Sequence, residues 1–385
     1  MRHSNLRTLL ILAVAALAAG LVLACNGGDG STGSVSDPGS SGGSVSDTGG
    51  SGTPGGTGPT GSGDEIYVPV SGVDGHLAIA LDARDIAALL EASPVDYAAV
   101  AQIYSAGKNS KNSDGSFRTL KGFATDAERA EEFADAVAFF GSPTFLDDDV
   151  SAAIDGTGEA AGWSDAQRKQ AINKGVLRTL YHWVLHEMHG AQDKLAAGEV
   201  DPADGAPHSW DEAWAFYAGA ADETGARPYA LAGTALKRED NYAKQGLIDQ
   251  PLREALADGL EAIEAGDESA LADAIERVES RLNAIFYLST ARYFQNAFEA
   301  ASAGDTEEVS IALIEGLSFY RTIQPMVAAA DPNADELISA FFSRPADSPF
   351  TLEERDEALA ALNRSQVASA LALEVTDLLS PASYG

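Results

Sequence analysis

The segment Arg178–Ala191, with the sequence RTLYHWVLHEMHGA, contains three of the six histidines of the chain and one glutamate. On a helix, His182, His186 and His189 follow one another at intervals of four and three residues and share one stripe. This stripe lies nearly opposite the apolar face of the helix, so a solvated polar face would explain it as well as a metal site. Glu187 differs from the histidines because it borders the apolar face. Imidazole and carboxylate groups gathered in one place are typical ligands of iron, manganese and zinc.

Glu315 gives the clearest sign of a carboxylate inside the fold. Its neighbours on a helical wheel are apolar, among them Ile311 and Phe319. A carboxylate in such surroundings is costly unless it is paired, hydrogen-bonded or bound to a metal. An ion pair with a buried arginine, for which Arg292 and Arg321 are candidates, is the alternative to a metal.

Three more side chains are candidates for the same interior. Glu279 lies at the edge of an apolar helix face, Asp211 borders buried tryptophans, and His208 immediately precedes the helix of Asp211. Ser209 and Glu212 fit a capping box at the start of that helix, which would point Glu212 away from the interior. Facing helices of a bundle commonly build metal sites between them. We therefore predict a metal site formed by inward-facing side chains, namely Glu187, His208, Asp211, Glu279 and Glu315.

The elements that must position these residues are helices. One stretch, Ile66–Gly72, looks like a strand, and helical periodicity dominates after it. Several predicted helices end at a glycine, and an acidic residue just after it begins the next helix. Pro325 should kink or end its helix within a turn. The sequence predicts an all-α fold, a multi-helix bundle of antiparallel pairs. The expected helices are Ala83–Ala92, Val95–Ala106, Asp126–Phe140, Ser164–Gly198, Ser209–Ala221, Pro251–Ala265, Glu268–Ala303, Thr306–Ala329, Asn333–Phe342, Leu352–Asn363 and Ser365–Leu379.

The N-terminal part of the chain has the pattern of an exported lipoprotein. Residues 1–24 combine early arginines with an apolar run, as in a signal peptide, and the run is too short for a typical membrane span. Val22–Cys25 resembles a bacterial lipobox, so Cys25 is the expected lipidation site. Residues 25–64 have the composition of a flexible Gly/Ser-rich tether. Residues 65–385 remain for an all-helical metal-binding domain. Asn26 favours the outer membrane, because aspartate at this position commonly retains lipoproteins at the inner membrane.

The charge of the chain limits its partners. There are 58 Asp and Glu against 25 Lys and Arg, a formal net charge of −33. Such a surface repels nucleic acid and attracts cations, although solubility or adaptation to salt explains the charge equally well. The segment Ser105–Ala124 is basic within this acidic chain. It lacks the first glycine of a Walker A loop, which disfavours nucleotide binding and leaves an ordered surface loop as the expectation.

Four segments together resemble the iron-assimilation family of low-iron-inducible periplasmic proteins, whose bacterial relatives are lipoproteins. They are DYAAVAQIYSAGKNSKNSDGSFRTLKGFA, LYHWVLHEMHGA, HSWDEAWAFYAGA and IFYLSTARYF with EGLSFYRTIQP, and they run from about Asp96 to Pro332. The resemblance implies iron acquisition through iron binding outside the cytoplasm. The matched positions are Glu187, His208, Asp211, Glu212 and Glu315. A weaker similarity to imelysin-like proteins fails at their G-x-H-x-x-E motif, because this chain offers only H-x-x-D.

The sequence thus favours a lipid-anchored, extracytoplasmic iron-binding protein that carries Fe²⁺ or Fe³⁺ without turnover. It would act in the cell envelope, with an iron permease or another envelope protein as a partner. Two alternatives stay open. One is a metal-dependent hydrolase or peptidase of the imelysin-like type, for which the H-E-x-x-H pattern and a nucleophile elbow are missing. The other is a non-catalytic docking or structural lipoprotein.

Overall fold

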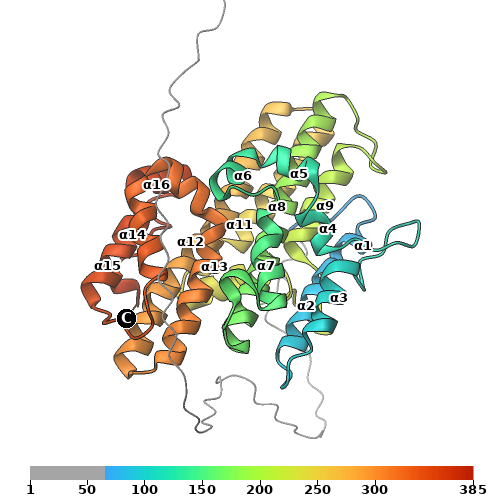
Figure 1. The fold of residues 1–385 in the computed structure, drawn as a ribbon. Coiled ribbons are helices and arrows are strands. Elements are labelled where there is room, and N and C mark those ends of the chain that lie inside the picture. The colour runs from blue at the N-terminus through green and yellow to red at the C-terminus, as the bar shows by residue number, and fades with distance from the viewer. Residues whose placement is uncertain (1–65, 385) are drawn as a thin grey trace, which may run out of the picture. The chain divides into compact units, whose positions relative to one another are not determined.

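Helices form nearly all of the regular structure in residues 66–384, which are the residues that the computed structural model describes. The predicted all-α fold is confirmed (Figure 1). The strand-like stretch at Ile66–Gly72 forms no strand, because it consists of turn, bend and irregular residues. Within the described residues, the one β-type pairing is an isolated bridge between Lys111 and Phe117. The predicted signal peptide, Cys25 and the predicted tether, residues 25–64, lie outside the described residues.

The helices of the first half are short except for one. Those before residue 160 are α1 (Asp74–Leu77), α2 (Ile79–Leu90), α3 (Tyr97–Ala106), α4 (Leu120–Ala124), α5 (Ala127–Glu132), α6 (Ala134–Phe140) and α7 (Phe145–Asp155), followed by a 3₁₀ turn at Gly158–Ala160. The long helix α8 (Asp165–Ala196) begins at a capping box, in which Ser164 and Gln167 exchange side-chain and backbone hydrogen bonds. Helix α9 (Ala206–Ala218) then packs along α8.

The second half is built around two long helices. Its elements are α10 (Leu231–Asn241), α11 (Asp249–Ala265), α12 (Glu268–Ala303), α13 (Thr306–Ala330), α14 (Pro332–Phe342), α15 (Leu352–Leu362), α16 (Ser365–Ala370) and a 3₁₀ turn at Pro381–Tyr384. The predicted end signals are confirmed at α11 and α12, where Gly266 and Gly304 adopt the left-handed conformation. Asp267 and Asp305 then cap the next helices through their side chains.

Helix α12 is the centre of the core. It packs against α11, α13, α8 and α15, and its middle part, residues 282–291, is buried all round. A helix without a polar face must be enclosed by others, which explains the layers of α8 and α9 on one side and α13 to α15 on the other. These layers are visible in Figure 1.

Several predicted helix limits are wrong for local reasons. The expected helix Asp126–Phe140 breaks at Phe133, which leaves α5 and α6 as separate pieces. By contrast, helix α13 runs through Pro325 and ends at Ala330, one residue beyond its predicted end at Ala329. The C-terminal helix expected to reach Leu379 ends at Ala370. The short helices α1 and α4, together with α7 and α10, were not predicted.

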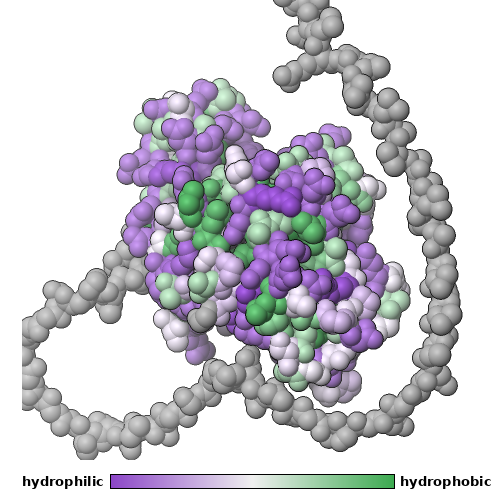
Figure 2. Space-filling view, turned by 90° about the vertical axis from the view of Figure 1, so that its left-hand side faces the viewer, coloured by the Kyte–Doolittle hydropathy of each residue, from purple (hydrophilic) through white to green (hydrophobic). Residues whose placement is uncertain are grey.

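The surface of the described residues is mixed in character. In Figure 2 hydrophilic residues cover most of the face on view, and apolar residues form smaller groups between them. No helix between residues 66 and 384 has the length and apolar character needed to cross a membrane.

Candidate functional site

Two histidines and two glutamates from three helices meet beside the N-terminal end of α9. The Nε2 atoms of His76 and His208 lie 2.8 Å and 3.0 Å from the same oxygen, Oε1 of Glu212. Glu187 makes a side-chain hydrogen bond to Glu212 as well. We call His76, Glu187, His208 and Glu212 the histidine–glutamate cluster.

The local sequence explains how these side chains come together. Helix α9 begins at Ala206, with Pro207 in its first turn, a position where proline costs no hydrogen bond. The predicted start at Ser209 is therefore wrong, and Glu212 does not cap the helix. Because His208 and Glu212 are four residues apart within α9, they share one face. That face meets Glu187 of α8 and His76 of α1.

Asp211 of α9 supports the histidine–glutamate cluster through Ser71. It is fully buried and accepts hydrogen bonds from Tyr67 Oη at 2.5 Å, Val70 N at 2.9 Å, Ser71 N at 2.7 Å and Ser71 Oγ at 2.7 Å. Oδ2 accepts three of these bonds and Oδ1 the fourth, so protein donors already stabilise this carboxylate without a metal. Since the Ser71 hydroxyl proton goes to Asp211, Ser71 Oγ accepts from Nδ1 of His208 at 2.9 Å. This contact directs Nε2 of His208 toward Glu212, as outer hydrogen bonds do for metal-binding histidines.

The pKa values of the two glutamates of the cluster are shifted in opposite directions. Burial raises the pKa of Glu187 well above its usual value, and the neighbouring charge of Glu212 raises it further. Burial also acts to raise the pKa of Glu212, but the hydrogen bond from His76 and the bond from Glu187 outweigh it, so this pKa falls. Of the two carboxyl groups, Glu187 therefore has the stronger tendency to hold a proton.

Aromatic side chains close one side of the cluster. Trp183 stacks between Phe123 and Phe216, with ring centroids 4.4 Å and 4.3 Å away, and Phe216 meets the ring of His76 edge-on at 5.7 Å. This wall limits access of water, and electrostatic interactions are stronger in such surroundings.

The structure brings Glu187 and His208 together but not the other predicted ligands. Glu315 pairs with Lys174, with Nζ 2.9 Å from Oε1, so a lysine takes the place of the arginine considered as the alternative. Lys174 and Glu187 lie thirteen residues apart on α8, which separates them by about 20 Å along the helix axis. Glu315 is therefore remote from the cluster.

Glu279 of α12 belongs to a second group of charged residues, which includes Glu132 of α5 and two histidines of α8. His186 and His189 direct their Nδ1 atoms to the two oxygens of Glu132, at 2.8 Å and 3.0 Å, and Glu279 lies 3.4 Å from Nε2 of His189. These hydrogen bonds, first that of Glu132, raise the pKa of His189 to about 9. His182, the third histidine of the stripe, is buried and its ring contacts Phe133 and Phe145 instead of solvent.

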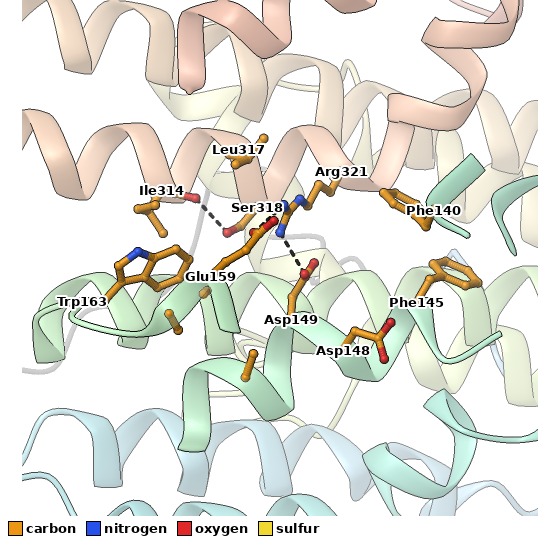
Figure 3. A pocket seen from close by; sticks show the side chains of 13 residues that line it. Phe140, Phe145, Asp148, Asp149, Glu159, Trp163, Ile314, Leu317, Ser318 and Arg321 are labelled. Carbon is orange, nitrogen blue, oxygen red and sulfur yellow. Dashed lines mark hydrogen bonds and ion pairs between the residues drawn. The ribbon is translucent and has the colours of Figure 1, made fainter. Parts of the chain in front are cut away.

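A cavity of about 340 Å³ lies between α7, α8 and α13, separate from both groups (Figure 3). Arg321 crosses it and pairs with Asp149 at 2.8 Å and Glu159 at 2.7 Å. Trp163 lines one end and Phe145 the other. The arginine is neutralised by its two partners, and no histidine lines this cavity. The Arg321 side chain ties α13 to α7, and neither it nor the cavity belongs to the histidine–glutamate cluster.

Sequence reasoning missed His76 and misplaced Glu212. His76 lies in a four-residue helix that no periodicity reveals. Glu212 follows His208 by four residues, a spacing that places two side chains on one face of a helix. The expected helix start at Ser209 left His208 outside the helix, so this signal was not used. In residues 66–384 no group of three or more His, Cys, Asp or Glu side chains has the geometry of a metal site as it stands. The donors are held by hydrogen bonds to one another.

These observations define a class of protein: an all-helical fold that gathers imidazole and carboxylate donors between its helices. The model of the low iron-inducible periplasmic protein family (Fea1) matches residues 56–315, which is more than half of the chain. The chain belongs to this family, as the sequence segments predicted. Neither the curated proteins nor the solved structures include a match.

Proposed function

We propose that this chain is an extracytoplasmic iron-binding protein that serves iron acquisition, and that iron binds at the histidine–glutamate cluster. The observation that carries this proposal is the approach of two imidazole nitrogens, of His76 and His208, to one oxygen of Glu212. Their distances of 2.8 Å and 3.0 Å are close to the spacing of about 3 Å between neighbouring ligands of an octahedral metal with bonds of about 2.1 Å. Two imidazoles with carboxylates suit iron, and zinc as well. The family, described as low iron-inducible, favours iron.

Binding at the cluster exchanges protons for the metal. Any proton held by Glu187 or by the Nε2 atoms must leave, so that these donors turn lone pairs to the cation. Ser71 already holds Nδ1 of His208 and so favours the ring orientation that a metal needs. Only small movements of side chains are required, because the donors are already in contact.

The rest of the proposal concerns the place and mode of action. Cys25 carries lipid, residues 25–64 act as a tether, and residues 65–385 form the metal-binding domain, held at the outer membrane. The protein binds and transfers iron without turnover, and an envelope permease is the partner expected to receive it. The family description names an expression pattern and a compartment and no reaction, which supports a binding role.

Calorimetric titration of the purified protein with Fe²⁺ under anaerobic conditions, and with Fe³⁺, tests the site. Glu187→Gln/Glu212→Gln should abolish tight binding. The matched control Glu279→Gln/Glu315→Gln removes the other two predicted carboxylates and should leave the affinity unchanged, provided that circular dichroism shows both variants folded. Binding that persists in the first variant and disappears in the control would refute the assignment.

A further inference from the structure

A second cavity, of about 330 Å³, lies between α6, α8 and α13 and shares no lining residue with the cavity of Arg321. Its wall is largely apolar and includes Phe133, Leu185 and Met326. Among the described residues, no lysine or arginine lines it, so an anionic ligand would lose its hydration without gaining a counter-charge. The cavity is therefore suited to an uncharged molecule.

His182 gives this cavity a hydrogen-bond acceptor. The residue lines the cavity although only 6% of its surface is exposed. Its Nδ1 lies 2.9 Å from the carbonyl oxygen of Arg178, and because a carbonyl only accepts, Nδ1 carries the proton. Burial lowers the pKa of His182 to about 4, so the ring is neutral at pH 7 and Nε2 holds a lone pair. No donor between residues 66 and 384 is bonded to Nε2.

Thr322 of α13 is a second polar side chain at this cavity. It lines the wall, and its Oγ1 is buried without a hydrogen-bond partner in the described part of the chain. A buried hydroxyl without a partner is costly. Threonine populates two χ1 rotamers in helices, so its hydroxyl and its methyl group can exchange places. A ligand that both donates and accepts would complete the hydrogen bonds of His182 and Thr322.

Aromatic rings surround the free acceptor. Phe133 and Tyr181 meet the ring of His182 edge-on, with centroids 4.8 Å and 5.1 Å away. Such surroundings favour an aromatic ligand, because ring edges and faces attract one another. We propose that this cavity binds an uncharged aromatic alcohol, whose hydroxyl group donates to Nε2 of His182 and accepts from Thr322. The site takes no part in the proposed iron binding.

The helices α5 and α6 form the outer wall of the cavity. Neither helix has a fully buried residue, and the chain breaks between them at Phe133. Glu132, at the end of α5, is held to α8 by its contacts with His186 and His189. Segments with few buried side chains open locally at low cost, so α6 gives a ligand a way in while α5 stays attached.

The test is a fluorescence titration of the full, iron-free protein with 1-naphthol, excited beyond the absorption of tryptophan. One molecule should bind per chain. Naphthalene, which lacks the hydroxyl group, should displace 1-naphthol about tenfold less effectively than unlabelled 1-naphthol competes, the factor expected for one or two hydrogen bonds. The anion 1-naphthoate should compete no better than naphthalene, because no cation among the described residues lines the cavity.

Four variants test the assignment of the residues. His182→Phe keeps a ring and removes Nε2, so 1-naphthol and naphthalene should bind equally well, and Thr322→Val should remove part of the preference. Leu185→Trp fills the cavity and should abolish binding. Leu317→Trp is the matched control, because it makes the same exchange in the cavity of Arg321 and should leave binding unchanged. Circular dichroism establishes that each variant is folded.

Three results would overturn the inference. They are a preference for 1-naphthol that survives in His182→Phe, tighter binding of 1-naphthoate than of 1-naphthol, and a wild-type protein without saturable binding of 1-naphthol. Calorimetric titration with iron should give the same metal affinity with and without 1-naphthol. Failure of the inference would therefore leave the proposed iron binding intact.

Discussion

Replacement of Asp211 by alanine should weaken both the fold and the metal site. In the wild-type protein this carboxylate anchors the segment 67–71 to α9 through four hydrogen bonds, three of them to Oδ2. Asp211→Ala leaves the donors of Tyr67, Val70 and Ser71 without their acceptor, and it frees the Ser71 hydroxyl that orients His208.

The size of the effect follows from these contacts. Hydrogen bonds to a charged acceptor contribute roughly 1.5–3 kcal/mol each, so four independent bonds would reach about 6–12 kcal/mol. The four are not independent, because the donors belong to one short segment that can detach and become hydrated. We expect the free energy of unfolding to fall by about 3–5 kcal/mol. Loss of the outer hydrogen bond to a metal-binding histidine costs about 10–100-fold in affinity, and the metal affinity should fall by that factor.

Urea unfolding followed by circular dichroism measures the free energy of unfolding, and calorimetric titration with iron measures the metal affinity. Asp335→Ala is a suitable control, since Asp335 accepts bonds from Tyr320, Gln324 and Ser339, away from the cluster. That variant should lose stability and keep its metal affinity. If Asp211→Ala bound iron as the wild type does, the argument that Ser71 orients His208 would fail.

Three further predictions concern other parts of the fold. Lys174→Met should lower stability by about 3–5 kcal/mol, because it leaves the Glu315 carboxylate buried and unpaired, and addition of Glu315→Gln should restore most of the loss in urea unfolding. The pKa of His189 is raised to about 9, because its protonated ring pairs with glutamates. The contribution of His189 to the free energy of unfolding is therefore complete below pH 6.5 and is lost as pH rises toward 9. His189→Gln should therefore be less stable than wild type at pH 6 and equal at pH 10. The difference should be at most about 1 kcal/mol, because the side chain is 41% exposed. Gly259→Ala should cost about 1–3 kcal/mol and alter tryptophan fluorescence, because the new methyl group would overlap the ring of Trp210.

The sequence was sufficient to predict the helical architecture, because long helices carry repeated and redundant signals. The limits of α12 follow from an aspartate cap and a glycine end, and its apolar surface places it at the centre. The short helices α1 and α4 have too few residues for any periodicity. Their positions depend on contacts with the loop 107–119, which only the folded chain shows.

For the candidate site, the sequence indicated only part of the arrangement. Glu187 and His208, which lie together in the histidine–glutamate cluster, could be singled out because a carboxylate at an apolar border and a histidine at a helix entry are visible in the sequence. That they bind a metal stays a prediction. Asp211 and Glu315 were correctly expected to face inward, but burial alone does not reveal which partner neutralises a carboxylate. The structure provides backbone and hydroxyl donors for Asp211 and a lysine for Glu315. An error of three residues in the start of α9 was enough to exchange the roles of Asp211 and Glu212.

An anomalous difference map at the iron edge, from crystals grown with iron, tests the central claim most directly. The account predicts its strongest peak at about 2.0–2.3 Å from Nε2 of both His76 and His208, with an oxygen of Glu212 at a similar distance. A peak at His186 and His189, or iron-bound crystals without density at the histidine–glutamate cluster, would contradict it.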